Sequence, residues 1–315
     1  MTPETIAVIV PTALMGPSGG TPYVVSCLES LLPAIEAPDG AGRVGRQRVR
    51  EVILVTQGRA LESPVVERIV AAGVHVRQMD VEGPFNFSRK VNIGAAVTTA
   101  DVLFLLNDDA QLRGPSWPEV FLGILTDPGI GAVGPVILNP DGSLNAAGDA
   151  LLSNGARHID EFDLRNRPGL AKILTADHDV TLLTAAALAI RRAAFLEIGG
   201  FDDAYPGSFG DADFCLRLGA AGHRLVCTPR VTVVHKESSS RDPTVSAATA
   251  EHFRRMHRKD FRDDPLLPPL VLHVRLRRSA VSSVRSSYRR TLKRFLPAQV
   301  RDRIRHAAKA CGWFK

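Results

Sequence analysis

The chain has 315 residues, 45% of them hydrophobic, a composition that can support one large folded domain with an extension. Its formal charge of +6 is unevenly divided, because residues 254–315 carry 18 Lys plus Arg against 4 Asp plus Glu, a local charge of +14, which leaves −8 for the rest. No apolar run approaches the roughly 20 residues of a membrane span, and no signal peptide is evident. The four scattered cysteines form no CxxC pair. We therefore expect a cytoplasmic protein with reduced thiols.

Hydrophobic runs alternate with segments that can be helical along the first 140 residues. Five runs are typical of buried strands: Ile6–Val10, Val52–Val55, Val74–Val76, Val102–Leu106 and Val133–Leu138. Helices are expected over Thr21–Ile35, with Pro22 in the first turn, and over Ser88–Val97. This alternation predicts an α/β fold with a mostly parallel central sheet and helices on its faces.

The second half of the chain is less regular. Asp141–Asp179 is rich in Gly, Asn, Asp and Arg, which predicts a long functional loop, either a lid or a segment that shapes an acceptor site. Val180–Ile190 fits a strand or a helix. A helix is expected over Phe214–Ala221 with Gly222 as its C-terminal cap, and a last strand over Cys227–Val234.

A basic helical tail is expected beyond Asp264, where three prolines mark a linker and Val284–Leu296 is amphipathic. Positive charge of this kind suits nucleic acid, anionic lipid or an acidic partner. Few aromatic residues lie between the charges, which weighs against nucleic acid. We expect peripheral contact with an anionic surface at the inner face of the cell membrane, and a solvated pair of basic helices is the alternative.

The clearest sign of a binding site is the apolar run Val102–Leu106, which stops on Asn107, Asp108 and Asp109. A strand covered on both faces delivers ligands at its carboxyl end, where open α/β sheets have their binding crevice. Carboxylate oxygens suit a hard divalent cation, which can neutralise the phosphates of a nucleotide. The run therefore predicts a metal and diphosphate site, with a turn and a solvated Asp109 as the alternative.

Two later residues complete a candidate catalytic site. Asp211 lies where a helix begins, and the helix N-terminus would stabilise the carboxylate of a base that deprotonates an alcohol. His235 ends the last strand and could join Asp109 as a metal ligand. The alternatives are an ordinary N-cap for Asp211 and a satisfied histidine for His235. Asp213 is expected to cap the helix or to form a salt bridge.

Several short motifs follow one another in a specific order. Among them are Ile9-Val10-Pro11-Thr12, Pro84-Phe85-Asn86-Phe87-Ser88, Asn92-Ile93-Gly94-Ala95, Leu105-Leu106-Asn107-Asp108-Asp109, Gly199-Gly200-Phe201-Asp202 and Asp211-Ala212-Asp213-Phe214-Cys215-Leu216-Arg217-Leu218. The ordered set resembles family 2 glycosyltransferases, most of all their rhamnosyltransferase-like branch. The resemblance covers Ile6 to Arg241, and the set is far more specific than any one motif.

The resemblance implies a GT-A fold with two functional halves. Residues 1–110 would form the nucleotide-sugar-binding half and residues 111–264 the acceptor half, followed by the basic extension at 265–315. The activity implied is the transfer of a sugar from a nucleotide-diphosphate sugar to a hydroxyl acceptor, which can be a glycan, a lipid-linked saccharide or a metabolite. The sugar would be transferred with inversion, and Mn²⁺ or Mg²⁺ would be the cofactor.

The resemblance also implies a role for each residue that matches a family motif. The residues that would bind the nucleotide sugar are Pro11, Thr12, Asn92, Asn107 and Asp108. The metal ligands would be Asp109, the last member of the strand-end triplet, and His235, the late histidine of the family. The family's catalytic base falls on Asp211, which would take the acceptor proton in a single displacement.

Three positions depart from the family pattern. Thr56 follows the second strand where an Asp usually contacts the nucleobase, which leaves the donor base open. Gly210 replaces the Glu that precedes the base, so we expect Asp211 to lack one supporting contact. Ala13-Leu14-Met15 stands where an aromatic-Asn pair is common.

Two other functions stay open. A non-catalytic scaffold of the same fold that binds sugar nucleotides is favoured by Thr56 and Gly210. A nucleotidyltransferase would share an acidic, metal-dependent site, but it would need a basic glycine-rich phosphate loop, and Gly16–Gly20 contains no Lys or Arg.

Overall fold

The structure is a computed structural model that describes residues 2–16, 20–37, 48–152, 155–158, 175–236, 243–257 and 260. The chain divides into two units, Met1–Leu267 and Pro268–Lys315, and every described residue lies in the first. The predicted basic tail, with its amphipathic segment Val284–Leu296, therefore lies outside the described residues, and the predicted boundary at residue 264 stays a prediction.

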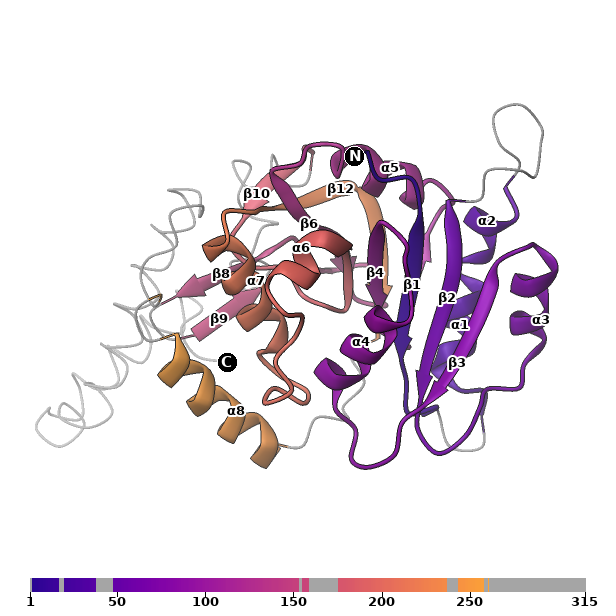
Figure 1. Cartoon of the computed structure of the whole chain (residues 1–315), viewed down its shortest axis with the longest axis horizontal. Coiled ribbons are helices and arrows are strands. Elements are labelled where there is room, and N and C mark those ends of the chain that lie inside the picture. The colour runs from indigo at the N-terminus through magenta and orange to yellow at the C-terminus, as the bar shows by residue number, and fades with distance from the viewer. Residues whose placement is uncertain are drawn as a thin grey trace, which may run out of the picture. The chain divides into compact units, whose positions relative to one another are not determined.

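The fold is built on a large mixed sheet whose main path has the strand order β10-β12-β6-β11-β4-β1-β2-β3 (Figure 1). The strands of this sheet are β1 Ile6–Pro11, β2 Val49–Thr56, β3 His75–Asp80, β4 Val102–Leu106, β5 Ala110–Arg113, β6 Ile130–Leu138, β7 Leu144–Ala146, β10 His178–Val180, β11 Ala187–Arg191 and β12 Arg224–His235. Strands β4, β1, β2 and β3 are parallel, and so are β6 and β12, whereas β11 runs antiparallel between β4 and β6. The predicted α/β class and all five predicted strands are confirmed.

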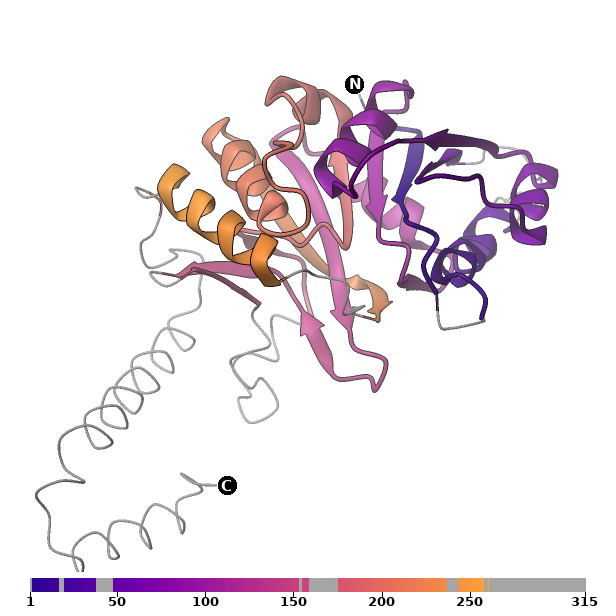
Figure 2. The same ribbon diagram turned by 90° about the horizontal axis from the view of Figure 1, so that it is seen from below.

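Helices cover both faces of this sheet (Figure 2). They are α1 Tyr23–Glu29, α2 Leu32–Ile35, α3 Pro64–Ala71, α4 Phe87–Ala96, α5 Trp117–Ile124, α6 Arg192–Glu197, α7 Gly210–Ala220 and α8 Pro243–Met256. Alternate residues of β1 point to opposite faces, so Val8 packs in the core cluster that includes residues of α1, α3 and α5. Ile9 faces α4, where its Cγ2 would lie only 2.6 Å from a Cβ on Gly94. The central strands are thus buried on both faces, and this burial fixes the position of the residues that follow each strand.

The predicted helix over Thr21–Ile35 is interrupted. It forms α1 and the short α2, with Ser30 and Leu31 between them. Pro33 lies in the first turn of α2, and a proline has no N–H for the carbonyl four residues earlier. The prediction of one continuous helix is therefore wrong at this proline.

The prediction of a long loop over Asp141–Asp179 is wrong for part of that segment. Gly142 adopts φ +80°, a left-handed turn conformation, and the chain reverses there so that β7 pairs antiparallel with β6. A separate hairpin, β8 Asp149–Leu152 with β9 Gly155–His158, follows. Tight turns let these strands of three or four residues pair, which composition alone did not reveal. Residues 159–174 lie outside the described part.

The other local predictions agree with the structure. Val180–Ile190 contributes the end of β10 and most of β11, so the strand alternative is the correct one. Helix α7 ends at Ala220, and Gly222 has φ +93°, which is typical of a residue after a helix C-terminus. Cys27, Cys215 and Cys227 are buried free thiols, and Cys311 lies outside the described residues.

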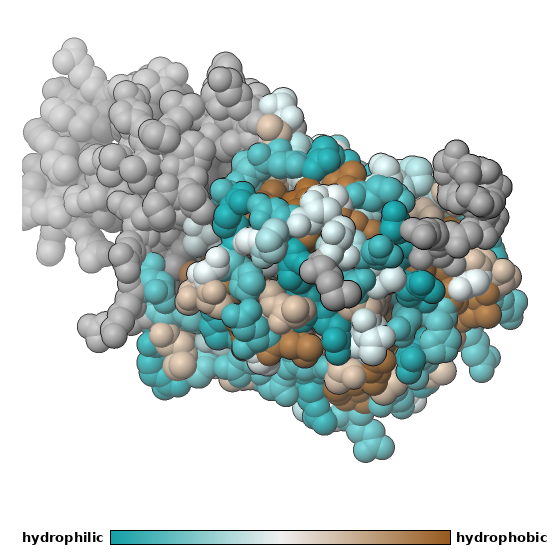
Figure 3. All heavy atoms as spheres, turned by 45° about the horizontal axis from the view of Figure 1, so that its top comes forward, coloured by the Kyte–Doolittle hydropathy of each residue, from teal (hydrophilic) through white to brown (hydrophobic). Residues whose placement is uncertain are grey.

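The face of the molecule drawn in Figure 3 is mainly hydrophilic where its residues are described. In Figure 3, hydrophobic side chains form small groups between hydrophilic ones. The exposed large hydrophobic residues of the described part are Met15, Val70, Phe85, Leu196 and Met256. Within that part of the chain, no helix has the length and apolar character needed to cross a membrane.

Candidate active site

Six of the eight predicted site residues lie at one edge of the sheet because strands β1, β4 and β12 end there: Pro11, Thr12, Asn107, Asp108, Asp109 and His235. Asn92 lies on α4 and Asp211 on α7. Strands β1, β2 and β4 are parallel neighbours, and β12 runs in the same direction two strands beyond β11. Thr12 follows β1, Asn107 follows β4, and His235 ends β12. The pairing of β12 with β5 places His235 opposite Ala110, and so beside Asp109.

Asp109 and His235 form a buried pair at this edge. Their side chains are 4% and 6% exposed, and Asp109 Oδ1 lies 2.9 Å from His235 Nε2. The amide nitrogen of Asn107 lies 3.3 Å from the same imidazole nitrogen. A carboxylate, an imidazole and a side-chain amide therefore converge from two strand ends that are far apart in the sequence.

Asp108 points to the neighbouring strand end. The Thr12 hydroxyl donates to Asp108 Oδ2 at 2.6 Å and accepts from the Leu14 backbone N–H at 2.8 Å. Burial raises the pKa of Asp108 to about 6, an effect that the hydrogen bond from Thr12 opposes and the charge of Asp109 reinforces. Thr12, which was predicted to bind the nucleotide sugar, is thus hydrogen-bonded to the acidic triplet Asn107–Asp109.

Asp211 lies in the first turn of α7, as the sequence predicted. Its carboxylate accepts hydrogen bonds from the backbone N–H groups of Ala212, at 2.9 Å, and Ala185, at 3.3 Å. The next residue, Ala186, accepts a hydrogen bond from the Asn107 N–H at 2.9 Å. Two short links therefore tie Asp211 to the end of β4.

Gly210 leaves no room for the Glu that the family pattern has before the base. A Cβ on Gly210 would lie 2.9 Å from Ser88 Oγ and 3.3 Å from Tyr205 Cβ. Here the support of Asp211 comes from backbone donors in place of a glutamate. The glycine at position 210 thus allows α7 to pack closely against α4.

Asn92 fastens two elements to each other. Its amide nitrogen donates to the Phe201 carbonyl at 2.8 Å and to Asp203 Oδ1 at 3.1 Å, and its amide oxygen accepts from the Phe201 N–H at 2.9 Å. These contacts join α4 to the turn that begins at Gly199. The predicted contact of Asn92 with the donor stays a prediction.

Lys90 lies beside the candidate site, although no sequence motif indicated it. It is 2% exposed, and its amino group donates to the carbonyls of Thr12 at 2.8 Å, Val55 at 3.1 Å and Thr56 at 2.8 Å. Burial lowers the pKa of Lys90 to about 8. The Lys90 ammonium group therefore joins the ends of β1 and β2. The sequence sign of a buried lysine was its position four residues before Gly94, on the same side of α4 as the apolar residues.

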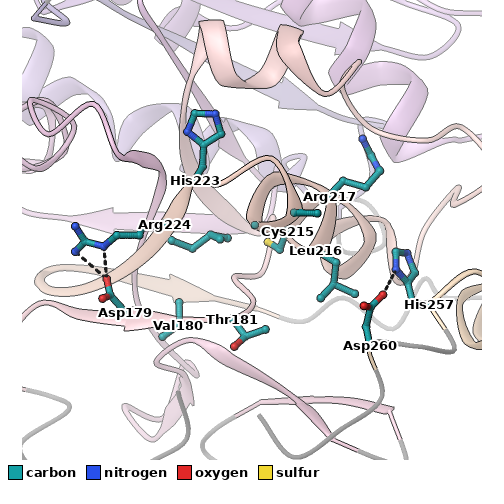
Figure 4. Close-up of a pocket in the computed structure, with 13 residues that line it drawn as sticks. Asp179, Val180, Thr181, Cys215, Leu216, Arg217, His223, Arg224, His257 and Asp260 are labelled. Carbon is teal, nitrogen blue, oxygen red and sulfur yellow. Dashed lines mark hydrogen bonds and ion pairs between the residues drawn. The ribbon is translucent and has the colours of Figure 1, made fainter. Parts of the chain in front are cut away.

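A separate cavity of about 550 Å³ lies between α7, β10, β12 and the end of α8 (Figure 4). Its lining includes Cys215, His223 and Arg224 and none of the predicted site residues. Across the described ranges, no group of three or more His, Cys, Asp and Glu side chains is arranged to hold a metal ion. The candidate metal site is thus the two-residue set of Asp109 and His235.

Comparison with known proteins identifies the class. The family model described as glycosyltransferase like family 2 matches residues 3–258. The chain therefore belongs to the family 2 glycosyltransferases, as its motifs indicated.

Two curated proteins show how much of the chain is shared with known relatives. The chain is 31% identical to the protein y4gI of Sinorhizobium fredii over 235 residues, which are 70% of this chain and 26% of that protein. It is 33% identical to the N-acetylglucosaminyl-diphospho-decaprenol L-rhamnosyltransferase of Mycobacterium tuberculosis over 163 residues, 48% of this chain and 52% of that enzyme. The chain thus spans about a quarter of the length of the first relative and about half of the length of the second.

Solved structures establish the fold. The mannosyltransferase PcManGT from Pyrobaculum calidifontis, solved with GDP-Man and Mn²⁺, superposes with a TM-score of 0.60 at 17% identity, covering 100% of this chain and 82% of that one. The architecture is the GT-A fold that the sequence predicted.

Proposed function

We propose that this chain is an inverting glycosyltransferase that moves a sugar from a nucleotide-diphosphate sugar to a hydroxyl acceptor. The observation that carries the proposal is the link from Asp211 through Ala185 and Ala186 to Asn107. This link connects the helix turn that carries the candidate base to the strand end that precedes Asp109, and so supports a shared site. Membership of the family supports the transfer chemistry.

The donor would lie across the ends of β1, β2 and β4. Pro11 and Thr12 would line its nucleobase, and Asn107 and Asp108 would contact its ribose. Thr56 offers a hydroxyl where relatives have a carboxylate, so the identity of the base is left to a donor screen.

Asp211 is the proposed catalytic residue. Its carboxylate would take the proton of the acceptor hydroxyl while that oxygen bonds to the anomeric carbon and the bond from this carbon to the diphosphate breaks on the opposite side. One displacement inverts the configuration and needs no covalent intermediate. The N–H groups of Ala185 and Ala212 orient the carboxylate for this step.

Asp109 and His235 fit a divalent cation such as Mn²⁺ or Mg²⁺. A hard cation accepts a carboxylate oxygen and a neutral imidazole, and these two groups already lie 2.9 Å apart in a buried position. A set of two protein ligands leaves room for phosphate oxygens. When bound, the cation would offset the negative charge of the departing diphosphate.

The test is nucleotide release from a panel of sugar nucleotides with Mn²⁺, for the wild type, Asp211→Asn and Asp109→Asn. Glu67→Gln is a matched control, since Glu67 is exposed on α3. We expect Asp211→Asn to lose about 10²- to 10⁴-fold in turnover while donor binding persists, because general base catalysis supplies a factor of this size. Asp109→Asn should raise the Mn²⁺ concentration needed for activity.

The scaffold alternative makes the opposite prediction. It would be supported if no donor released nucleotide and Asp211→Asn bound donors as the wild type does. The anomeric configuration of a transferred sugar, measured by NMR, tests inversion separately.

We further propose that the acceptor is lipid-linked. A relative supports this, since the mycobacterial enzyme is named for a decaprenol-linked substrate. The +14 charge of residues 254–315 supports contact of the tail with an anionic membrane surface. Sedimentation with anionic vesicles, with and without residues 265–315, tests this contact, and salt-independent, equal behaviour would contradict it.

A further inference from the structure

We propose that helix α8 positions the base, because Phe253 and His257 hold the first turn of α7 on both sides of Asp211. This inference rests on the proposed function, in which Asp211 takes the acceptor proton. Figure 2 shows α8 alongside α7, and α8 is the last helix of the described part.

The residue that caps α7 has an unusual backbone. Phe209 has φ 64° and ψ −2°, a left-handed conformation that bulky residues rarely adopt, and it lies two positions before Asp211. Such a conformation persists only where surrounding contacts enforce it. The Phe209 ring stacks on Phe253 of α8, with ring centroids 5.1 Å apart and an angle of 27° between the planes.

Phe253 is itself held firmly. It is fully buried, and its ring lies 4.8 Å from the His257 ring and, edge to face, 6.3 Å from the Tyr205 ring. The carbonyl of Tyr205 accepts a hydrogen bond from Ser88 Oγ at 2.7 Å, which connects this aromatic cluster to α4. The stack on Phe209 is thus part of a packed layer and is not an isolated surface contact.

A second contact lies two positions after Asp211. His257 Nε2 is 2.8 Å from Asp213 Oδ1, and Asp213 Oδ2 accepts from Arg217 Nε at 2.8 Å. The Asp213 N–H in turn donates to the Phe209 carbonyl at 2.9 Å, which closes the first turn of α7. His257 also faces Asp260 (Figure 4), so the histidine that directly follows α8 lies between two carboxylates.

These contacts make Phe253 and His257 positioning residues, because they act on Asp211 through Phe209 and Asp213. The proposed donor residues lie at the ends of β1 and β4 and, for Asn92, on α4, and α8 supplies none of them. Loosening α8 should therefore move the base relative to the acceptor and leave donor binding intact.

The test compares Phe253→Ala with the conservative Phe253→Leu and with Met256→Ala, a control on the same helix whose side chain is 61% exposed. We expect Phe253→Ala to lower kcat about 10- to 100-fold, since small misplacements of a reacting group have effects of this size. Donor affinity, measured by titration, should stay within about twofold of the wild type. Phe253→Leu should recover most of the turnover, and Met256→Ala should behave as the wild type.

A double variant separates this inference from the proposed function. In the Asp211→Asn background, Phe253→Ala should cause no further loss, because the group that it positions is already gone. Full additivity of the two losses, or wild-type kcat in a folded Phe253→Ala protein, would overturn the role of α8 while leaving Asp211 as the base. Full activity of Asp211→Asn alone would overturn the base, and with it both proposals.

His257→Gln is the second test variant, to be used if circular dichroism shows that Phe253→Ala does not fold. It keeps most of the side-chain volume and removes the charged contact with Asp213. We expect a lower kcat with unchanged donor affinity, and wild-type kcat for this variant would count against the inference.

Discussion

The buried amino group of Lys90 allows a quantitative test of how the donor edge of the sheet is held. Lys90→Met keeps the length and the apolar stem of the side chain and removes the donor to the carbonyls of Thr12, Val55 and Thr56. These carbonyls lie at the ends of β1 and β2, where the nucleobase is proposed to bind.

The structure sets the size of the effect. The Val55 carbonyl also accepts the Thr12 N–H at 3.0 Å, and the Thr56 carbonyl also accepts the Val81 N–H at 3.2 Å. The variant therefore removes one of two donors from each of these carbonyls, and the Thr12 carbonyl bears the main cost of a buried group that loses its partner, about 1–3 kcal/mol. Part of this cost is recovered because the variant no longer buries an ammonium ion. We expect a net loss of about 1–2 kcal/mol in the free energy of unfolding, or about 2–8 °C in Tm for a domain of this size.

Thermal unfolding and titration with the sugar nucleotide measure the two consequences. Arg89→Met is the matched control, since Arg89 is the neighbouring cation on α4 and is exposed. Lys90→Met should have the lower Tm and should bind the donor more weakly than this control, because Thr12 and Thr56 lose their common anchor. Equal Tm values for the two variants would refute the assignment of Lys90 as the link between the strands.

Two further predictions concern packing and pH. Gly94→Ala should lower the free energy of unfolding, measured in urea, by about 1–3 kcal/mol, because its Cβ would lie 2.6 Å from Ile9 Cγ2. Gly123→Ala on α5, which meets nothing within 4 Å, should be neutral or stabilise by up to about 1 kcal/mol, and equal losses at both positions would contradict the packing argument. Burial lowers the pKa of His257, but its ion pairs with Asp213 and Asp260 outweigh burial and raise it. The pairs should therefore stabilise the fold fully below pH 6.5, and this contribution should be lost as the pH rises through the raised pKa. His257→Gln should accordingly differ most from the wild type in urea near pH 6, where the histidine is charged and the carboxylates are ionised, and a difference that does not change between pH 6 and pH 9 would argue against this ion pair.

Local patterns predicted the parts of the fold that depend on neighbouring residues. Val102–Leu106 was predicted with the bounds of β4, because a strand buried on both faces needs an unbroken apolar run. Asp211 was placed at a helix start by the turn residues before it and the apolar spacing after it. The ordered motifs identified the family, since their joint occurrence is far more specific than any one of them.

Contacts between distant segments were decided only by the tertiary structure. The register of β12 on β5 sets His235 beside Asp109, and the folding of α4 against β1 and β2 brings Lys90 to three carbonyls. The strained Phe209 and its stack on Phe253 could not be read from either residue's neighbours. Periodicity and turn chemistry act over a few residues, whereas strand register and helix packing depend on how whole faces fit together. The sequence by itself therefore determined the fold class and the candidate residues, and the packing of the folded chain decided how those residues meet.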